Sequence, residues 1–210
     1  MINNWKDLPI GKFQQISKIC EHSSEDELEQ VDDRIKIVSI LSDKSVSDLE
    51  NLPITEFAEI YKQTKFLYEE MPKSDIDFEK GLTINGKDYY IFHDFTKMKT
   101  AHYIDFQKLV KTIDNGMALV LSTCIIPKGK EYNRGYDITK VQKQIREHLS
   151  VVDANGICFF FAKKFKSSMG TFLTYLEKDK TLSKESREKM KEQVKKAKKV
   201  LEQSGDGRTM

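Results

Sequence analysis

Residues 81–92 read Gly-Leu-Thr-Ile-Asn-Gly-Lys-Asp-Tyr-Tyr-Ile-Phe, two short apolar segments on either side of an Asn-Gly pair. Asn-Gly readily adopts the two positive φ angles of a type I′ turn, so we predict an antiparallel hairpin with strands Gly81–Ile84 and Lys87–Phe92. Two strands alone bury too little apolar surface to be stable in water. The hairpin therefore requires helices or another chain against its apolar face.

Apolar residues recur at helical spacing on both sides of the hairpin. We expect Asp7 to cap a first helix that begins at Pro9, and Asn51 to cap a helix that begins at Pro53. Ser45 has the position of a cap for a short helix that ends at Asn51. Further helices are predicted over Val31–Leu41, Pro53–Met71, 100–115, Ile138–Leu149 and Ile157–Leu176.

The most apolar run, Met117–Ile126, is compatible with a buried helix or a buried strand. We favour a helix because helical patterns flank it. The predicted fold is therefore mainly α, of the α+β type. It is a helical domain with one small antiparallel β-hairpin and a basic C-terminal helix.

A break in the helical pattern at Met71-Pro72 and a change of composition near the C-terminus divide the chain into three segments. Residues 1–72 form an N-terminal helical part, and residues 73–180 contain the hairpin and a helical core that we place in one domain with the first part. Residues 181–210 form a basic helix and a frayed end. Between Lys184 and Lys199 there are eight Lys or Arg and three Glu, with an apolar stripe that includes Met190, Val194 and Leu201.

Net charge and hydropathy point to no particular partner and to no membrane. The formal charge is only +2, the N-terminus has no apolar signal core, and no apolar run approaches the ~20 residues that span a bilayer. Cys20, Cys124 and Cys158 are widely spaced and odd in number, which is typical of reduced thiols. These features predict a cytoplasmic protein.

His93, Asp94, His102 and Asp105 form the one sequence cluster that could bind a metal or perform acid–base chemistry. No third ligand lies at a familiar spacing, and the chain has no phosphate-binding loop, dinucleotide-binding turn or nucleophile elbow. We therefore predict a protein that is not an enzyme and has no cofactor and no metal. A small metal-dependent enzyme that uses these four residues is kept as an alternative.

The chain resembles a family of tailed bacteriophages known as tail assembly chaperones. The similarity covers about Asn4–Leu176 and rests on structural residues in five segments: Trp5-Lys6-Asp7-Leu8-Pro9 with Phe13, Asn51-Leu52-Pro53-Ile54, Ile84-Asn85-Gly86-Lys87-Asp88-Tyr89, Tyr103-Ile104-Asp105-Phe106 and Ile126-Pro127-Lys128-Gly129-Lys130-Glu131-Tyr132-Asn133. The resemblance implies a non-enzymatic protein in the host bacterial cytoplasm. It would coat or guide the tape-measure protein while the tail tube polymerises around it, and it would bind amphipathic helices reversibly. The lysine-rich C-terminal helix departs from the family pattern.

Candidate partner-binding residues come from the hairpin, the Pro127–Asp137 loop and the C-terminal stripe. They are Tyr89, Ile91, Tyr132, Arg134, Tyr136, Met190, Val194 and Leu201. Apolar and aromatic residues in such positions also commonly complete a protein's own core. A homo-oligomer is an open possibility.

Two alternatives concern what the protein contacts. One is a structural component of the virion, such as a connector, tail or internal capsid protein, with the basic helix near packaged DNA. The protein could instead bind nucleic acid through Lys195, Lys196, Lys198 and Lys199, in which case affinity would fall steeply with salt.

Overall fold

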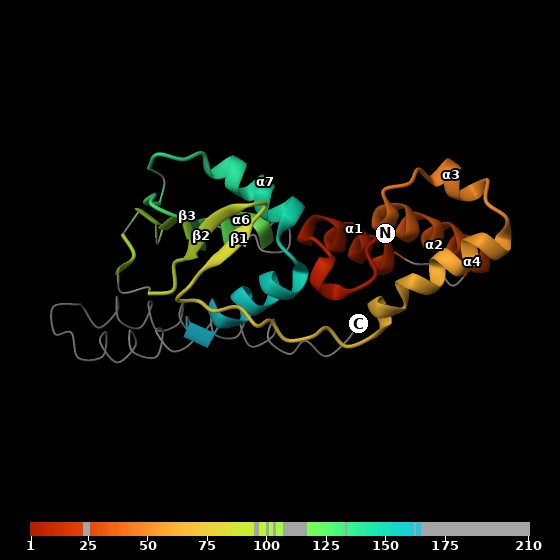
Figure 1. The fold of residues 1–210 in the computed structure, drawn as a ribbon, viewed down its shortest axis with the longest axis horizontal. Coiled ribbons are helices and arrows are strands. Elements are labelled where there is room, and N and C mark those ends of the chain that lie inside the picture. The colour runs from red at the N-terminus through yellow and green to blue at the C-terminus, as the bar shows by residue number, and fades with distance from the viewer. Residues whose placement is uncertain are drawn as a thin grey trace, which may run out of the picture. The chain divides into compact units, whose positions relative to one another are not determined.

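The computed structural model describes residues 1–22, 26–94, 97–99, 101–102, 104–106, 117–132, 134–161 and 163–164. The chain divides into two compact units, Met1–Gly156 and Ile157–Met210. Within the described residues, helices predominate and are accompanied by one small antiparallel sheet, which confirms the predicted mainly α, α+β class (Figure 1). The C-terminal helix predicted for residues 181–210 lies outside the described residues. The predicted segment boundaries stay predictions.

The N-terminal part of the first unit consists of short helices. In chain order these are η1 Trp5–Asp7, α1 Ile10–Glu21, α2 Glu27–Ser42, α3 Val46–Glu50, α4 Ile54–Lys62 and η2 Gln63–Tyr68. Helix α2 contacts α1, α3 and α4. The helix predicted to continue to Met71 instead tightens into η2 after Lys62 and ends at Tyr68.

Two predicted helix caps are wrong. Asp7 lies inside η1, where its backbone N–H donates to the Asn4 side chain at 3.0 Å, and Pro9 is the N-cap of α1. Asn51 is the C-cap of α3, and Pro53 is the N-cap of α4. The ring of proline fixes φ and removes the backbone N–H, so it fits the extended residue before a helix as well as the first residue within one.

The predicted cap at Ser45 is confirmed. Its hydroxyl oxygen accepts a hydrogen bond from the backbone N–H of Asp48 at 3.1 Å, which satisfies one of the donors that the start of α3 leaves unpaired.

The predicted hairpin is confirmed. Strands β1 Leu82–Ile84 and β2 Lys87–Ile91 pair in antiparallel fashion, with Ile84 opposite Lys87. Asn85 and Gly86 have φ angles of 47° and 71°, the pair of positive values that a type I′ turn requires.

A third strand adjoins the hairpin. Met117–Cys124 is helix α6, as predicted for most of the run, but the prediction is wrong for its last two residues because Ile125–Pro127 forms β3. Ile125 lies opposite Ile91, so the sheet order is β1-β2-β3. The added strand pairs the free edge of β2 and supplies part of the apolar cover that a hairpin alone lacks.

Helix α7, Ile138–His148, covers this sheet. It contacts β1, β3, α6 and α1, and its Val141 and Ile145 are buried. The carboxylate of Asp137 caps it by accepting from the Thr139 N–H at 2.9 Å. Residues 151–161 that follow are also helical.

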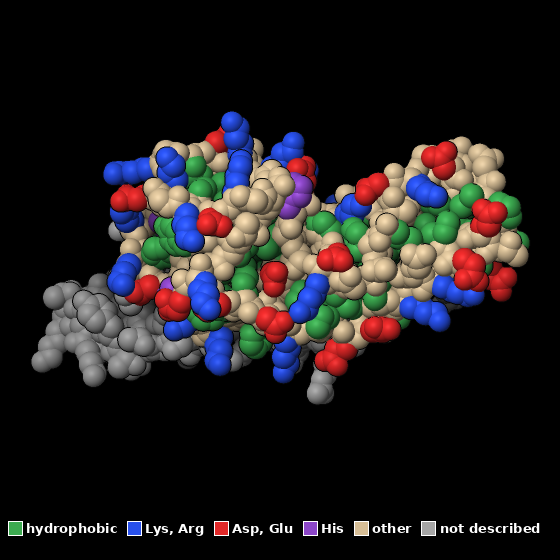
Figure 2. Space-filling model, viewed as in Figure 1, with side chains coloured by type: hydrophobic (Ala, Val, Ile, Leu, Met, Phe, Trp, Pro, Cys, Tyr) green, Lys and Arg blue, Asp and Glu red, His purple; other side chains and the backbone are tan. Residues whose placement is uncertain are grey.

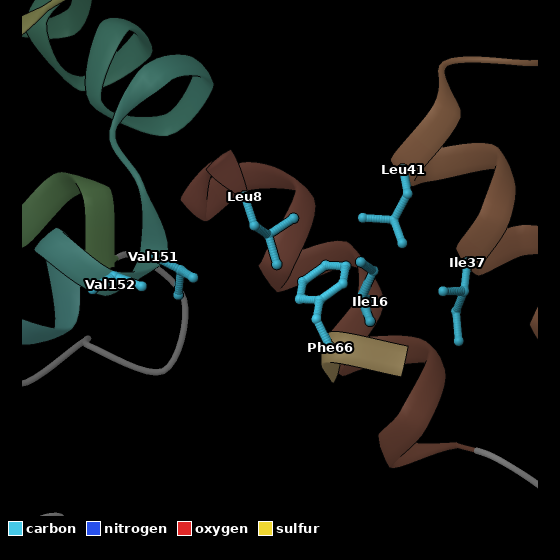
Figure 3. Close-up of a cluster of buried hydrophobic side chains, with 7 residues drawn as sticks. All are labelled: Leu8, Ile16, Ile37, Leu41, Phe66, Val151 and Val152. Atoms are coloured by element: carbon cyan, nitrogen blue, oxygen red, sulfur yellow. The ribbon is translucent and has the colours of Figure 1, made fainter. Parts of the chain in front are cut away.

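Backbone hydrogen bonds tie the start of the first unit to the residues after α7. The Val151 N–H donates to the Leu8 carbonyl at 2.7 Å, and the Ile10 N–H donates to the Leu149 carbonyl at 3.0 Å. Around this connection lies a cluster of buried side chains, drawn in Figure 3: Leu8, Ile16, Ile37, Leu41, Phe66, Val151 and Val152. Trp5 packs edge-on against Phe13 and Phe66 beside it. Residues about 140 positions apart thus share one core.

Candidate protein-binding surface

The two hairpin residues predicted to bind a partner are buried in the sheet. Tyr89 and Ile91 point to the covered face of β2, where Tyr89 lies opposite Leu82 and Pro127. Burial alone raises the pKa of the Tyr89 hydroxyl. In this conformation both side chains complete the core of the protein itself, so a partner could reach them only if the sheet opened.

The predicted loop turns one of its tyrosines inward. The Tyr132 ring stacks on His102 with 3.8 Å between ring centres and 5° between planes, and its hydroxyl donates to Asp105 at 3.2 Å. Burial first, and then the Asp105 carboxylate, raises the pKa of Tyr132. Arg134 is exposed, and Tyr136 is half-buried. Of these three candidates, Arg134 is the one freely accessible to a partner.

The four residues of the predicted metal or acid–base cluster each contact a group outside the cluster. His102 is buried and its Nε2 lies 2.5 Å from the Thr123 carbonyl oxygen, while burial lowers the pKa of its imidazole. His93 lies 3.3 Å from Glu79, and Asp94 lies 3.3 Å from Lys97. Among the residues that the structure describes, no group of three or more His, Cys, Asp or Glu could hold a metal ion.

A polar cavity of about 400 Å³ lies beside the contact between α1 and α7. The helices approach closely there, because a Cβ added to Gly11 would lie 2.8 Å from the Arg146 carbonyl oxygen. Lys12, on its wall, is already paired with both carboxylate oxygens of Asp43 at 2.7 and 2.8 Å. The positive charge of Lys12 is therefore already compensated and is of little use for binding a ligand in this cavity.

Helix α4 has a distinct apolar face, yet none of its residues is buried. Phe57 and Tyr61 stack with ring centres 6.2 Å apart, and both are half-buried. Ile54, one turn before Phe57 on the same face, is almost fully exposed. An amphipathic helix normally buries such a face, so the incomplete cover of α4, with Ile54 exposed, is unusual.

The apolar face of α4 continues onto α2 and η2. The Arg34 guanidinium lies 5.6 Å above the Tyr61 ring, and the Tyr61 and Tyr68 hydroxyls are 2.9 Å apart. The hydrogen bond to Tyr61 is the main cause that raises the pKa of Tyr68 to about 12. Val31 and Leu28 lie one and two turns before Arg34 on α2.

We name these residues together the α2–α4 surface. Its members are Leu28, Val31, Arg34, Ile54, Phe57, Tyr61 and Tyr68. The exposed fractions are 79% for Leu28, 42% for Val31, 79% for Ile54 and 74% for Tyr68. Figure 2 shows hydrophobic side chains at the surface around α4, with Asp and Glu side chains beside them. Several large apolar side chains exposed together mark an interaction site more often than scattered ones do.

The helical spacing of apolar residues in the sequence predicted the apolar face of α4 but gave no prediction of what covers it. Phe57, Ile60 and Tyr61 on this face are half-buried, whereas Ile54 is exposed, and only the packing reveals this difference. The strong acidity of the surrounding sequence is the signal that could have indicated this surface.

No protein-family model, no curated protein and no solved structure matches this chain. Within the described ranges, none of the helices combines the length and the apolar character needed to cross a membrane.

Proposed function

We propose that this protein is a non-enzymatic phage morphogenesis protein that binds the tape-measure protein or another tail protein during assembly in the host bacterial cytoplasm. The proposal takes its partner from the resemblance to tail assembly chaperones. Its structural support is the α2–α4 surface, which includes the exposed residues Leu28, Ile54 and Tyr68. Such a surface gains free energy when a partner covers it.

A role in reversible protein binding fits the way this surface is built. Its central residues, Phe57 and Tyr61, are held in place by stacking and by the contact with Arg34. Its outer residues, Leu28 and Ile54, make few contacts with the protein itself. A partner would therefore meet aromatic groups that are already held in place, and aromatic residues are enriched at the centre of protein interfaces.

The test is quantitative mass spectrometry of purified mature virions and of the infected-cell lysate. A chaperone should be abundant in the lysate, should be absent from the particle, and should co-purify with a tail protein before assembly is complete. The double variant Leu28→Ser with Ile54→Ser should reduce that co-purification, whereas Ile104→Ser, which alters an exposed apolar residue elsewhere, should not.

A fixed number of copies in every particle would overturn the chaperone proposal. It would make the protein a structural component of the virion, the alternative that the sequence left open. If the protein co-purified with no tail protein and was absent from particles, a role in tail assembly would be excluded.

A further inference from the structure

The part of the chain that carries the α2–α4 surface is strongly acidic. Residues 26–70 contain twelve Asp or Glu and five Lys or Arg, a formal charge of −7 in a chain whose total is +2. On α2, exposed Glu27, Glu29 and Asp32 alternate with the exposed apolar residues Leu28 and Val31. The apolar surface is thus bordered by uncompensated negative charge.

The ion pairs of this segment leave much of that charge unneutralised. Asp33 pairs with Lys36 within α2, Glu59 pairs with Lys62 within α4, and Asp43 pairs with Lys12 of α1. None of these three pairs involves the exposed carboxylates of α2 that border Leu28 and Val31. The one cation of the surface, Arg34, lies over the Tyr61 ring. The field that an approaching partner meets is therefore negative, and it favours cations and disfavours nucleic acid.

We propose that the α2–α4 surface binds a Lys- or Arg-rich amphipathic helix of a partner protein. This inference rests on the proposed function and specifies the chemistry of the partner at that site. The apolar stripe of such a helix covers Leu28, Ile54 and the Phe57–Tyr61 pair, and its flanking cations face Glu29 and Asp32.

A helix suits this surface better than an extended peptide does. Strand addition needs an unpaired sheet edge, whereas the surface is built from α2, α4 and η2, whose backbone groups are engaged within the helices. Binding therefore depends on side chains spaced one turn apart, such as Leu28 and Val31 or Ile54 and Phe57, which match the i, i+3 and i+4 stripe of a second helix.

The probe is a labelled synthetic helix of about 18 residues, or five turns, that contains only Leu and Lys with Leu along one face. Its twin carries Glu at every Lys position. Fluorescence anisotropy with the full-length protein gives the dissociation constant of each peptide. We expect the Lys peptide to bind at least ~10-fold more tightly than the Glu twin at low salt, and the difference to shrink as salt is raised.

Matched variants locate the site. Leu28→Ser combined with Ile54→Ser should weaken binding of the Lys peptide at least ~10-fold, because each side chain loses its apolar contact. Ile104→Ser is the apolar control and should leave binding within about two-fold. Glu29→Lys should weaken binding by about 3- to 5-fold, whereas Glu79→Lys, an exposed charge reversal on another segment, should have little effect.

Several results would overturn the inference. Equal binding of the Lys peptide to the wild type and to the Leu28→Ser, Ile54→Ser variant would place the site elsewhere. Equal binding of the two peptides would remove the charge selectivity. If the Lys peptide bound only after Met190, Val194 and Leu201 were changed to Ser, the occupant of the surface would be the chain's own C-terminal segment and not a partner protein.

Failure here is distinguishable from failure of the proposed function. If the surface variants lost no peptide binding but a tail protein still co-purified with the wild type from infected cells, the assembly role would stand and the partner would use another surface. If peptide binding followed the expected pattern but no tail protein co-purified, the surface would bind cationic helices and the assembly role would fail.

Discussion

Replacing Gly81 by Ala should destabilise the sheet far more than a typical surface substitution does. Gly81 has a φ of +79°, and a Cβ at this position would lie 2.2 Å from the Tyr89 carbonyl oxygen and 3.1 Å from the Tyr90 Cα. Both atoms belong to the backbone of β2, so no side chain can turn aside to make room. Either β2 must shift or the chain at residue 81 must move.

The expected decrease in the free energy of unfolding of Gly81→Ala has two parts. The left-handed conformation costs an L-residue about 1–2 kcal/mol. The displacement of the β2 backbone adds strain and weakens ladder hydrogen bonds, for a total of about 3–5 kcal/mol in the free energy of unfolding. A loss of this size is a large fraction of the stability of an ordinary domain.

Gly86→Ala is the matched control. Gly86 has a similar φ of +71°, but no atom lies within 4 Å of the Cβ that alanine would introduce. This variant therefore carries only the conformational cost of about 1–2 kcal/mol. The difference between the two variants isolates the contact with the Tyr89 carbonyl.

The assay is urea unfolding of both variants and the wild type, followed by far-UV circular dichroism and by the fluorescence of Trp5, the single tryptophan. Trp5 packs against Phe13 and Phe66, so its signal also reports whether loss of the sheet loosens the helical core. Equal losses of stability in Gly81→Ala and Gly86→Ala would refute the reasoning, because they would show that β2 accommodates the added methyl group without cost.

Three further predictions concern the helices and the buried histidine. Burial lowers the pKa of His102 below its ordinary 6.5, so as the pH falls His102 is protonated in the unfolded chain before it is protonated in the folded one. The stability that neutral His102 contributes should be complete above pH 6.5 and should be lost as the pH falls through its lower folded-state pKa. His102→Gln should reduce this dependence of the free energy of unfolding on pH, measured by urea unfolding at several pH values. An unchanged pH dependence in the variant would contradict the prediction. Leu8→Ala, in the buried cluster of Figure 3, should cost about 2–5 kcal/mol in thermal or urea unfolding, whereas Leu28→Ala on the exposed surface should cost less than about 0.5 kcal/mol, and similar losses would be inconsistent with the observed burial. Ser45→Ala should cost about 1 kcal/mol through loss of the bond to the Asp48 N–H, and Ser47→Ala, inside the same helix and exposed, should be nearly neutral by the same measurement.

The sequence by itself determined the features that depend on a few neighbouring residues. Asn85-Gly86 specified the turn and hence the pairing of β1 with β2, because positive φ angles are a local property of those residue types. Ser45 specified the start of α3 for a similar reason, since its hydroxyl reaches a backbone N–H three residues later. The helical spacing of apolar residues likewise predicted the helix over Ile138–Leu149, and Val141 and Ile145 on it are buried.

Reasoning from neighbouring residues failed where two backbone conformations of the same segment have similar intrinsic preference. Asp7 and Pro9 could each begin a helix, as could Asn51 and Pro53, and the choice depended on which residue became extended. Ile125 is apolar enough for a buried helix or a buried strand, and its pairing with Ile91 decided between them. These alternatives differ by little in intrinsic preference, so tertiary contacts select one of them.

Only the tertiary structure decided which of the predicted contact residues are accessible. Tyr89, Ile91 and Tyr132 are turned into the protein, while Leu28 and Ile54 stay exposed within an acidic segment. A sequence shows that a side chain is apolar, but whether it is covered depends on segments far away along the chain. The physical reason is that burial results from packing between elements, whereas turns and caps result from the conformations of adjacent residues.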